Sequence, residues 1–242
     1  MTTGTFVSQE KIRDLVPRID YSEALTITAT PDDVVAACRT AVKHGFRAVV
    51  SFPCYLELLV RELSGTGVLA QLPIGFPGGA VTSAIKRAEA EEGLKTGATD
   101  FDMVMNIGAL KARDYSRVSQ DITGVAEIVR AAGNPLKVII EVGALSDDEI
   151  VTASKIAEEC GATHIKTCTG FNPGRATMHA IALIRNTVGD RVGIKASGGV
   201  ASLEDAIAFM DAGATVVAAR ITVVEHLEAA LSGRQARAWR SS

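Results

Sequence analysis

The sequence alternates short apolar stretches rich in β-branched residues with longer helical stretches, about eight times over its 242 residues. Strands are predicted within 18–21, 48–52, 68–74, 99–106, 137–142, 163–171, 192–199 and 215–219, the sixth and seventh of these stretches ending in a turn. Such alternation favours a parallel sheet with helices outside it, and eight units in this length favour a closed (β/α)8 TIM barrel. An open Rossmann-type sheet would require a G-x-G-x-x-G turn after an early strand, which the sequence lacks.

Helix boundaries are marked by capping signals. Thr30 is followed by Pro31 and two aspartates, which is typical of a helix start, and Gly45 marks the end of that helix. Residues 146–149 form a capping-box pattern, and residues 10–16 are predicted to be a short leading helix. We therefore expect residues 1–242 to form a single barrel domain, with a leading helix within 1–17 and a basic tail at 233–242.

Composition argues against several classes of protein. The chain is 47% hydrophobic and 22% charged with a net charge of −3, so neither nucleic acid nor an anionic membrane is an expected partner. Residues 63–85 are uncharged but contain two prolines and five glycines, which favours a strand and a loop over a membrane span. The four cysteines have no C-x-x-C spacing, and no signal peptide is recognisable at the N-terminus. These features favour a cytoplasmic protein with reduced thiols.

Three charged residues lie in predicted buried strands, close to their carboxyl ends: Asp102, Lys166 and Lys195. In a TIM barrel these ends converge on one face, where function is located. A lysine amine attacks a carbonyl only when neutral, and both burial and a neighbouring ammonium lower its pKa. One of the two lysines could then be the nucleophile and the other its cationic neighbour, and Asp102 could hold Lys195 and transfer protons. The alternative is a pair of buried Lys–Asp ion pairs with a purely structural role.

The motifs around these residues resemble the deoxyribose-phosphate aldolase family. The matching segments are Lys166–Phe171, Lys195–Gly199, Asp100–Val104, Gly75–Gly79 and Lys137–Glu141. The resemblance implies a TIM-barrel class I aldolase that reversibly cleaves 2-deoxyribose 5-phosphate to acetaldehyde and glyceraldehyde 3-phosphate, with no metal and no cofactor. It also implies a homodimer.

By position, the resemblance assigns the Schiff base to Lys166, the lowering of its pKa to Lys195 and the proton relay to Asp102. Asp20 matches the family's aspartate near the end of the first strand. The substrate-binding residues are expected in the loops after the strands: Asp20, Thr169, Gly170, Ser197, Gly198, Gly199 and Arg220.

The anion-binding segments depart from the family pattern. Where the family has a Gly-Thr-Ser-Ser-Gly type loop after strand eight, this chain has 213–222 with Arg220 in place of a serine, and Val200-Ala201 replaces a basic residue after Gly199. Residues 20–25 also replace the usual Asp-His-Thr-Leu-Leu. Arg220, with Arg175, could bind a phosphate or carboxylate as a bidentate fork. Alternatively Arg220 forms an outward salt bridge, the substrate carries no phosphate, or the barrel is a lapsed enzyme that acts as a binding module.

Other candidates carry less weight. The four histidines (His44, His164, His179 and His226) have no metal-binding spacing, so a metal-dependent aldolase is not expected. His164 could face the pocket or be a core residue. Cys168 shares a strand face with Lys166 and could be trapped by reactive aldehydes, or be a plain buried thiol. Glu141 is expected to point inward from strand five and could pair with a lysine.

Overall fold

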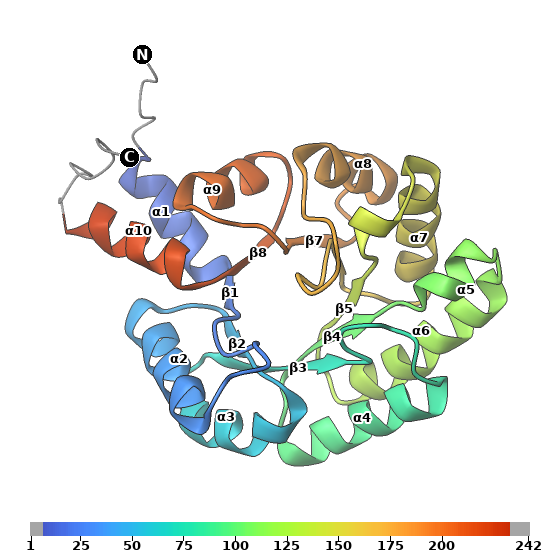
Figure 1. Cartoon of the computed structure of the whole chain (residues 1–242), viewed down its shortest axis with the longest axis horizontal. Helices are drawn as coiled ribbons and strands as arrows, with labels where there is room; N and C mark the ends of the chain where they lie inside the picture. The colour runs from blue at the N-terminus through green and yellow to red at the C-terminus, as the bar shows by residue number, and fades with distance from the viewer. Residues whose placement is uncertain (1–6, 233–242) are drawn as a thin grey trace.

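The computed structural model describes residues 7–232, which contain a closed barrel of eight parallel strands in chain order. Figure 1 shows the strands as an inner ring with the helices around it. The strands are β1 (Ile19–Tyr21), β2 (Ala48–Val50), β3 (Leu69–Ile74), β4 (Asp100–Val104), β5 (Leu136–Ile139), β6 (His164–Lys166), β7 (Gly193–Ala196) and β8 (Val216–Ala219). The predicted TIM-barrel fold is confirmed.

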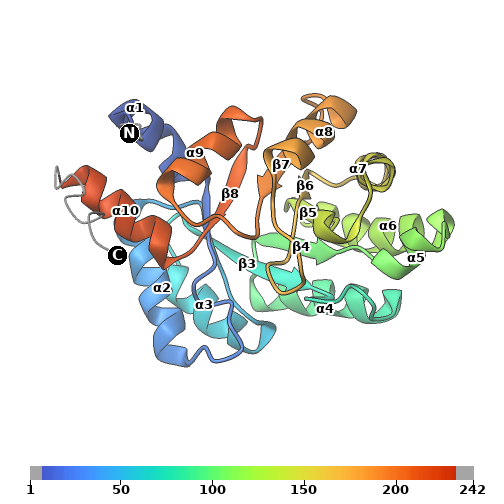
Figure 2. The ribbon, with the colours of Figure 1, turned by 45° about the horizontal axis from the view of Figure 1, so that its top comes forward.

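The helices form the outer layer, as the tilted view in Figure 2 also shows. They are α1 (Gln9–Leu15), α2 (Pro31–His44), α3 (Leu56–Leu63), α4 (Ser83–Thr96), α5 (Ile107–Lys111), α6 (Tyr115–Ala131), α7 (Asp147–Glu159), α8 (Met178–Val188), α9 (Leu203–Asp211) and α10 (Ile221–Leu231). Three short 3-10 helices are η1 (Val16–Arg18), η2 (Pro53–Tyr55) and η3 (Val142–Ala144). The leading helix α1 packs beside α9, although the two are separated by most of the chain.

The capping signals act as the sequence indicates. The Thr30 side chain accepts a hydrogen bond from the Asp33 amide in a capping box, and Gly45 ends α2 in the left-handed conformation with φ 75°. Ser146 forms a second capping box with Glu149 at the start of α7. Local chemistry therefore sets where these helices begin and end.

Some boundaries differ from those predicted. The leading helix begins and ends one residue earlier than 10–16. The fifth strand, predicted to reach Val142, ends at Ile139, because Glu141 turns the chain with φ 54° and ψ 61°. The sequence analysis missed α5, which begins where the Asn106 side chain caps the Ala109 amide. The predicted basic tail at 233–242 lies outside the described residues.

Strand register brings the charged residues together inside the barrel. Lys166 of β6 pairs with Lys195 of β7, and Asp102 of β4 pairs with Lys137 of β5. Paired residues on neighbouring strands point to the same face of a sheet. All four residues are buried, with at most 3% of their surface exposed. Within residues 7–232, no helix is both long enough and apolar enough to cross a bilayer.

Candidate active site

The centre of the candidate site is one carboxylate oxygen shared by two lysines. Asp102 Oδ2 lies 2.8 Å from Lys166 Nζ and 2.7 Å from Lys195 Nζ. The two amines are therefore neighbours, and the structure brings together the three residues that the sequence analysis singled out.

Asp20 and Gln71 complete the surroundings of Lys195. Asp20 Oδ2 lies 2.6 Å from Lys195 Nζ, and the Lys195 ammonium also donates to Gln71 Oε1 at 3.0 Å. The Gln71 amide nitrogen in turn donates to Asp20 Oδ2 at 2.9 Å. Asp20 therefore lies near the end of β1, as predicted, and its carboxylate contacts Lys195 directly. Its substrate-binding role stays a prediction.

A further group of charges, which sequence reasoning missed, lies on the same inner face. Lys137 Nζ is 2.5 Å from Asp100 Oδ1 and 3.2 Å from Asp102 Oδ1. The Arg47 guanidinium donates to both Asp20 and Asp100, at 2.6 Å and 2.8 Å. The available signal was the two-residue spacing of Asp100 and Asp102, which puts both on one strand face. The partners came from strands distant in sequence, so the network itself was not predictable by spacing.

The two lysines that share Asp102 have opposite pKa shifts. Burial lowers the pKa of Lys166 to about 8, with a further lowering from Lys195 that Asp102 opposes. Burial would also lower the pKa of Lys195, but Asp102 and Asp20 outweigh it and raise that pKa. Lys195 therefore stays an ammonium while Lys166 has a sizeable neutral fraction near neutral pH. The like-charged neighbour that we expected to lower the pKa of Lys166 does so, but burial is the larger cause.

The carboxylates stay ionised. Burial would raise the pKa of Asp102, but Lys137, Lys166 and Lys195 together hold it well below its usual range. Asp102 Oδ1 is fully buried, and its closest charged neighbour is the Lys137 ammonium at 3.2 Å. The two oxygens of Asp102 therefore face three lysine amines between them.

The loops after β6 and β7 are joined to each other beside the lysines. Thr167 Oγ1 donates to the Ser197 carbonyl at 2.7 Å and accepts from the Ser197 amide at 2.9 Å. Gly198 has φ 88°, and a Cβ there would lie 2.9 Å from Cys168 Cβ, so this close approach requires glycine. Ser197, Gly198 and the neighbouring Gly170 thus line one compact rim next to Lys166.

Within residues 7–232, Glu141 does not pair with a lysine, which was one alternative of the sequence analysis. Its buried carboxylate contacts no lysine among the described residues and instead accepts hydrogen bonds from the Thr169 amide and hydroxyl, the latter at 2.7 Å. Asn172 Nδ2 donates to the same carboxylate at 3.0 Å. The backbone at Glu141 is left-handed, with φ 54°, and the side chain reaches the loop after β6. Glu141 therefore fastens the loop that carries Thr169 and Gly170.

The two arginines considered for anion binding lie apart from the lysine cluster. Arg220, at the start of α10, is 55% exposed in its side chain and donates to Glu23 Oε2 from Nε at 3.4 Å. This is the salt-bridge alternative of the sequence analysis. Arg175 is exposed in the loop after β6 and packs its side chain against Gly199, where an added Cβ would lie 2.8 Å from Arg175 Cβ.

Cys168 and His164 take the less reactive of their two alternatives. Burial, followed by the Glu141 carboxylate, raises the pKa of Cys168 to about 12, which leaves a protonated thiol. Burial and the nearby Lys137 lower the pKa of His164 to about 4. His164 Nδ1 lies 3.1 Å from Thr163 Oγ1, at the beginning of β6 rather than its end.

Three phenylalanines from different loops meet at the carboxyl end of the barrel. Phe76 and Phe171 pack edge to face with ring centroids 5.0 Å apart, and Phe52 packs on both at 6.3 Å and 6.1 Å. They follow β3, β6 and β2 respectively. This aromatic cluster gives the mouth an apolar side.

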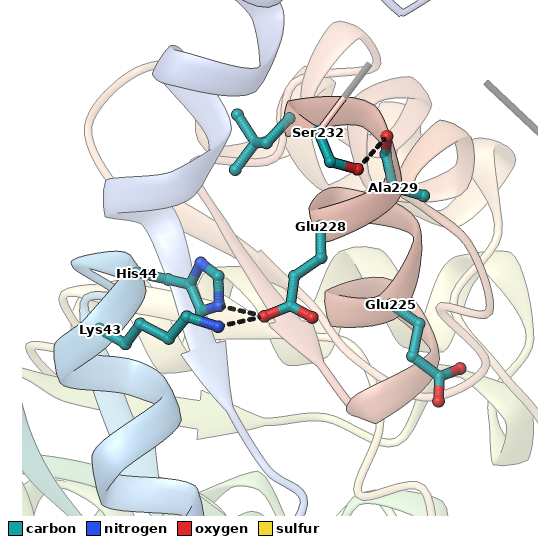
Figure 3. A pocket seen from close by; sticks show the side chains of 7 residues that line it. Lys43, His44, Glu225, Glu228, Ala229 and Ser232 are labelled. Carbon is teal, nitrogen blue, oxygen red and sulfur yellow. Dashed lines mark hydrogen bonds and ion pairs between the residues drawn. The ribbon is translucent and has the colours of Figure 1, made fainter. Parts of the chain in front are cut away.

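A hollow elsewhere on the surface carries no comparable chemistry. It lies between α2 and α10, and Figure 3 shows the Glu228 carboxylate facing Lys43 and His44, while Glu225 points away from them. Glu228 Oε1 is 2.5 Å from Lys43 Nζ and 3.0 Å from His44 Nε2. No group of three or more metal-ligating side chains is found within 7–232.

A TIM barrel with two buried lysines sharing one aspartate defines the class of lysine-dependent aldolases. Sequence comparison then identifies the family. The chain is 43% identical over 206 residues to the deoxyribose-phosphate aldolase of Methanothermobacter thermautotrophicus, covering 85% of this chain and 90% of the relative. It is 40% identical over 212 residues to that of Caldanaerobacter subterraneus subsp. tengcongensis, covering 87% and 91%. The chain belongs to the deoxyribose-phosphate aldolase family and is a lyase.

Solved structures agree with this assignment. The aldolase QR15 superposes with a TM-score of 0.85 at 30% identity, covering 91% of this chain and 97% of that one. The tetrameric deoxyribose phosphate aldolase from Aeropyrum pernix superposes with a TM-score of 0.82 at 26% identity, covering 93% and 99%. A scan of protein-family models gave no match.

Proposed function

We propose that this aldolase cleaves a 2-deoxyribose skeleton reversibly into acetaldehyde and a glyceraldehyde-type aldehyde through an imine on Lys166. The observation that supports this most is the sharing of Asp102 Oδ2 by Lys166 and Lys195 inside the barrel. The relatives are named for the 5-phosphate of this sugar. We propose Asp20, Thr169, Gly170, Ser197, Gly198 and Gly199 as the substrate-binding residues.

Imine formation begins with neutral Lys166. Its nitrogen bonds to the aldehyde carbon of the open-chain sugar, and the carbinolamine then loses water as its hydroxyl is protonated. Lys195 is the nearest ammonium and supplies this proton, while Asp102 passes protons between the two amines. The resulting iminium carries the positive charge that the Asp102 carboxylate stabilises.

Carbon–carbon cleavage follows from this charge. The electron pair of the bond between sugar carbons 2 and 3 moves toward the iminium nitrogen, and the carbon-3 hydroxyl loses its proton as the new aldehyde forms. We assign the acceptance of that hydroxyl proton to the Asp102 carboxylate, which contacts Lys166 through Oδ2, directly or through water. The enamine left on Lys166 is then protonated on carbon, and hydrolysis releases acetaldehyde and restores the amine.

The test is reductive trapping. The purified chain is incubated with acetaldehyde and borohydride, and intact-mass and peptide analysis then looks for an added ethyl group. We expect one adduct, on Lys166, and none in Lys166→Ala. Lys86, another buried lysine, is the internal control and should stay unmodified. An adduct elsewhere, or no adduct in the wild-type chain, would contradict the assignment of Lys166.

Assembly and compartment are also proposals. We propose a homodimer, as the family resemblance implies, in the cytoplasm, as the absence of C-x-x-C cysteine pairs favours. The structural neighbour from Aeropyrum pernix is a tetramer, so association occurs among similar chains. Light scattering coupled to size-exclusion chromatography would measure the mass of the assembly directly.

A further inference from the structure

The junction between β8 and α10 is occupied by a carboxylate of the chain itself. The Ile221 amide, the first of α10, donates to Glu23 Oε2 at 2.9 Å, and Arg220 Nε donates to the same oxygen at 3.4 Å. Arg220 is the N-cap residue of α10 but provides no side-chain cap. Glu23 therefore caps this helix from outside it and neutralises its arginine.

The β1 loop is held in place for this contact. Tyr21, the last residue of β1, pairs with Ala219, the last residue of β8, and the two strands lie side by side in Figure 1. Ser22 then donates to the Ala219 carbonyl from its amide at 2.9 Å and from its hydroxyl at 3.1 Å. These bonds fix the next residue, Glu23, at the start of α10.

This position is where an anion would otherwise be favoured. A helix N-terminus presents unpaired amides and a positive dipole end, and TIM barrels often bind phosphate after strands seven and eight. Here the Glu23 carboxylate already accepts hydrogen bonds from the Ile221 amide and from Arg220 Nε. An incoming phosphate would have to displace Glu23 or lie beside its negative charge.

The junction also lies at the rim of the candidate active site. Asp20 precedes Glu23 by three residues on the same strand and loop, and its carboxylate lies 2.6 Å from Lys195 Nζ. Gly198 and Gly199 follow β7, the strand beside β6 that carries Lys166, and Arg220 follows β8. Because TIM barrels often bind a substrate phosphate in these two loops, we expect the far end of a substrate bound to Lys166 to reach them.

Building on the proposed function, we infer that Glu23 is a specificity-determining residue that disfavours a phosphate at the far end of the substrate. The preferred sugar carries a neutral hydroxyl there. A negative charge beside a binding site disfavours a negatively charged ligand. Glu23 would therefore distinguish the phosphorylated from the unphosphorylated sugar without contacting the reacting atoms.

The experiment compares kcat/KM for 2-deoxyribose and 2-deoxyribose 5-phosphate on the full chain. We expect the wild-type chain to prefer the unphosphorylated sugar. Glu23→Gln keeps an oxygen for the Ile221 amide but removes the charge, so it should shift the ratio toward the phosphorylated sugar by about tenfold or more. Inorganic phosphate should inhibit Glu23→Gln more strongly than the wild-type chain.

Glu228→Gln is the matched control, because it makes the same change two turns further along α10, where Glu228 pairs with Lys43. Its ratio should equal that of the wild-type chain. A wild-type preference for the phosphorylated sugar, or a ratio that Glu23→Gln leaves unchanged, would overturn the inference. Acetaldehyde carries no phosphate, so a failure to trap it on Lys166 would count against the proposed function and not against Glu23.

Discussion

Two buried lysine–aspartate pairs in this molecule look alike locally and differ in what surrounds them. Lys86 Nζ lies 2.5 Å from Asp121 Oδ2, between α4 and α6, and is fully buried. Lys166 Nζ lies 2.8 Å from Asp102 Oδ2 inside the barrel. Burial is the largest cause of a lowered pKa in both lysines.

The difference lies in the sharing of the carboxylate and in access. The second partner of Lys86 is the Val104 carbonyl at 2.8 Å, so Lys86 shares its aspartate with no second amine among the described residues. Lys166 shares its carboxylate with the ammonium of Lys195 and sits at the carboxyl end of β6, beside the barrel mouth. A lowered lysine pKa therefore does not identify a nucleophile. A second, permanently charged amine and an open route to substrate are also needed.

Removing each lysine gives the sharpest contrast. Lys166→Ala should lower kcat/KM by at least about 1,000-fold, because no other amine is placed to form the imine. The double replacement Lys86→Met with Asp121→Leu removes the other pair without leaving an unpaired charge. It should leave kcat/KM within a few-fold and the free energy of unfolding unchanged or raised by about 1–4 kcal/mol. Steady-state kinetics and urea unfolding measure both, and a comparable loss of activity in the double variant would refute the contrast.

Neutralising the two aspartates is expected to have the next largest effect. Asp102→Asn should lower kcat by about 100- to 1,000-fold, because an amide can neither carry protons nor stabilise the iminium. Asp121→Asn, the matched control, should leave kcat within a few-fold while destabilising the fold by about 1–3 kcal/mol. Equal losses of activity in the two variants would show that Asp102 acts only through folding.

The pH profile tests the cause of the Lys166 pKa. The trapping rate should rise about tenfold per pH unit and level off near pH 8, where neutral Lys166 predominates. Lys195→Met removes a repelling charge, so the midpoint should move to higher pH, but only in part because burial remains. A midpoint that stays fixed in Lys195→Met would leave burial as the sole cause.

The lowered pKa of Lys166 also affects stability, with a sign opposite to that expected for Lys195, whose pKa is raised. Because the folded pKa of Lys166 lies below the model-peptide value of 10.5, the unfolded chain binds more protons between about pH 8 and 10.5. The contribution of Lys166 to the free energy of unfolding should therefore rise with pH across this window. Urea unfolding of the wild type and of Lys166→Met at pH 7 and pH 10 isolates this contribution. The sign is confirmed if the free energy of unfolding of the wild type, relative to that of Lys166→Met, is higher at pH 10 than at pH 7.

The smallest expected effect is at Glu141, which contacts Thr169, a proposed substrate-binding residue, rather than the lysines. Glu141→Gln weakens the charged hydrogen bonds to Thr169, so KM should rise about three- to tenfold with little change in kcat. Glu149→Gln, at the exposed start of α7, makes the same change away from the mouth and should alter neither constant. A fall in kcat without a change in KM would mean that Glu141 takes part in the chemistry.

The sequence by itself determined the barrel and the residues that would meet inside it. Alternating periodicity, the caps at Thr30 and Ser146 and the placement of Asp102, Lys166 and Lys195 near strand ends are local properties, and helix capping and strand pattern depend on few neighbours. The fold class then predicted that these residues lie at one end of the barrel, because its parallel strands all have their carboxyl ends on the same face.

Only the tertiary structure decided which charges are shared. The Asp100 carboxylate accepts hydrogen bonds from three residues that lie on or beside different strands: Arg47, Gln71 and Lys137. These contacts form only when the strands are assembled into the closed barrel. The left-handed turn at Glu141 and the capping of α10 by Glu23 likewise join segments that have no local signal. Desolvation and charge pairing depend on three-dimensional distance, so a linear pattern can name the ionisable groups but cannot assign their partners.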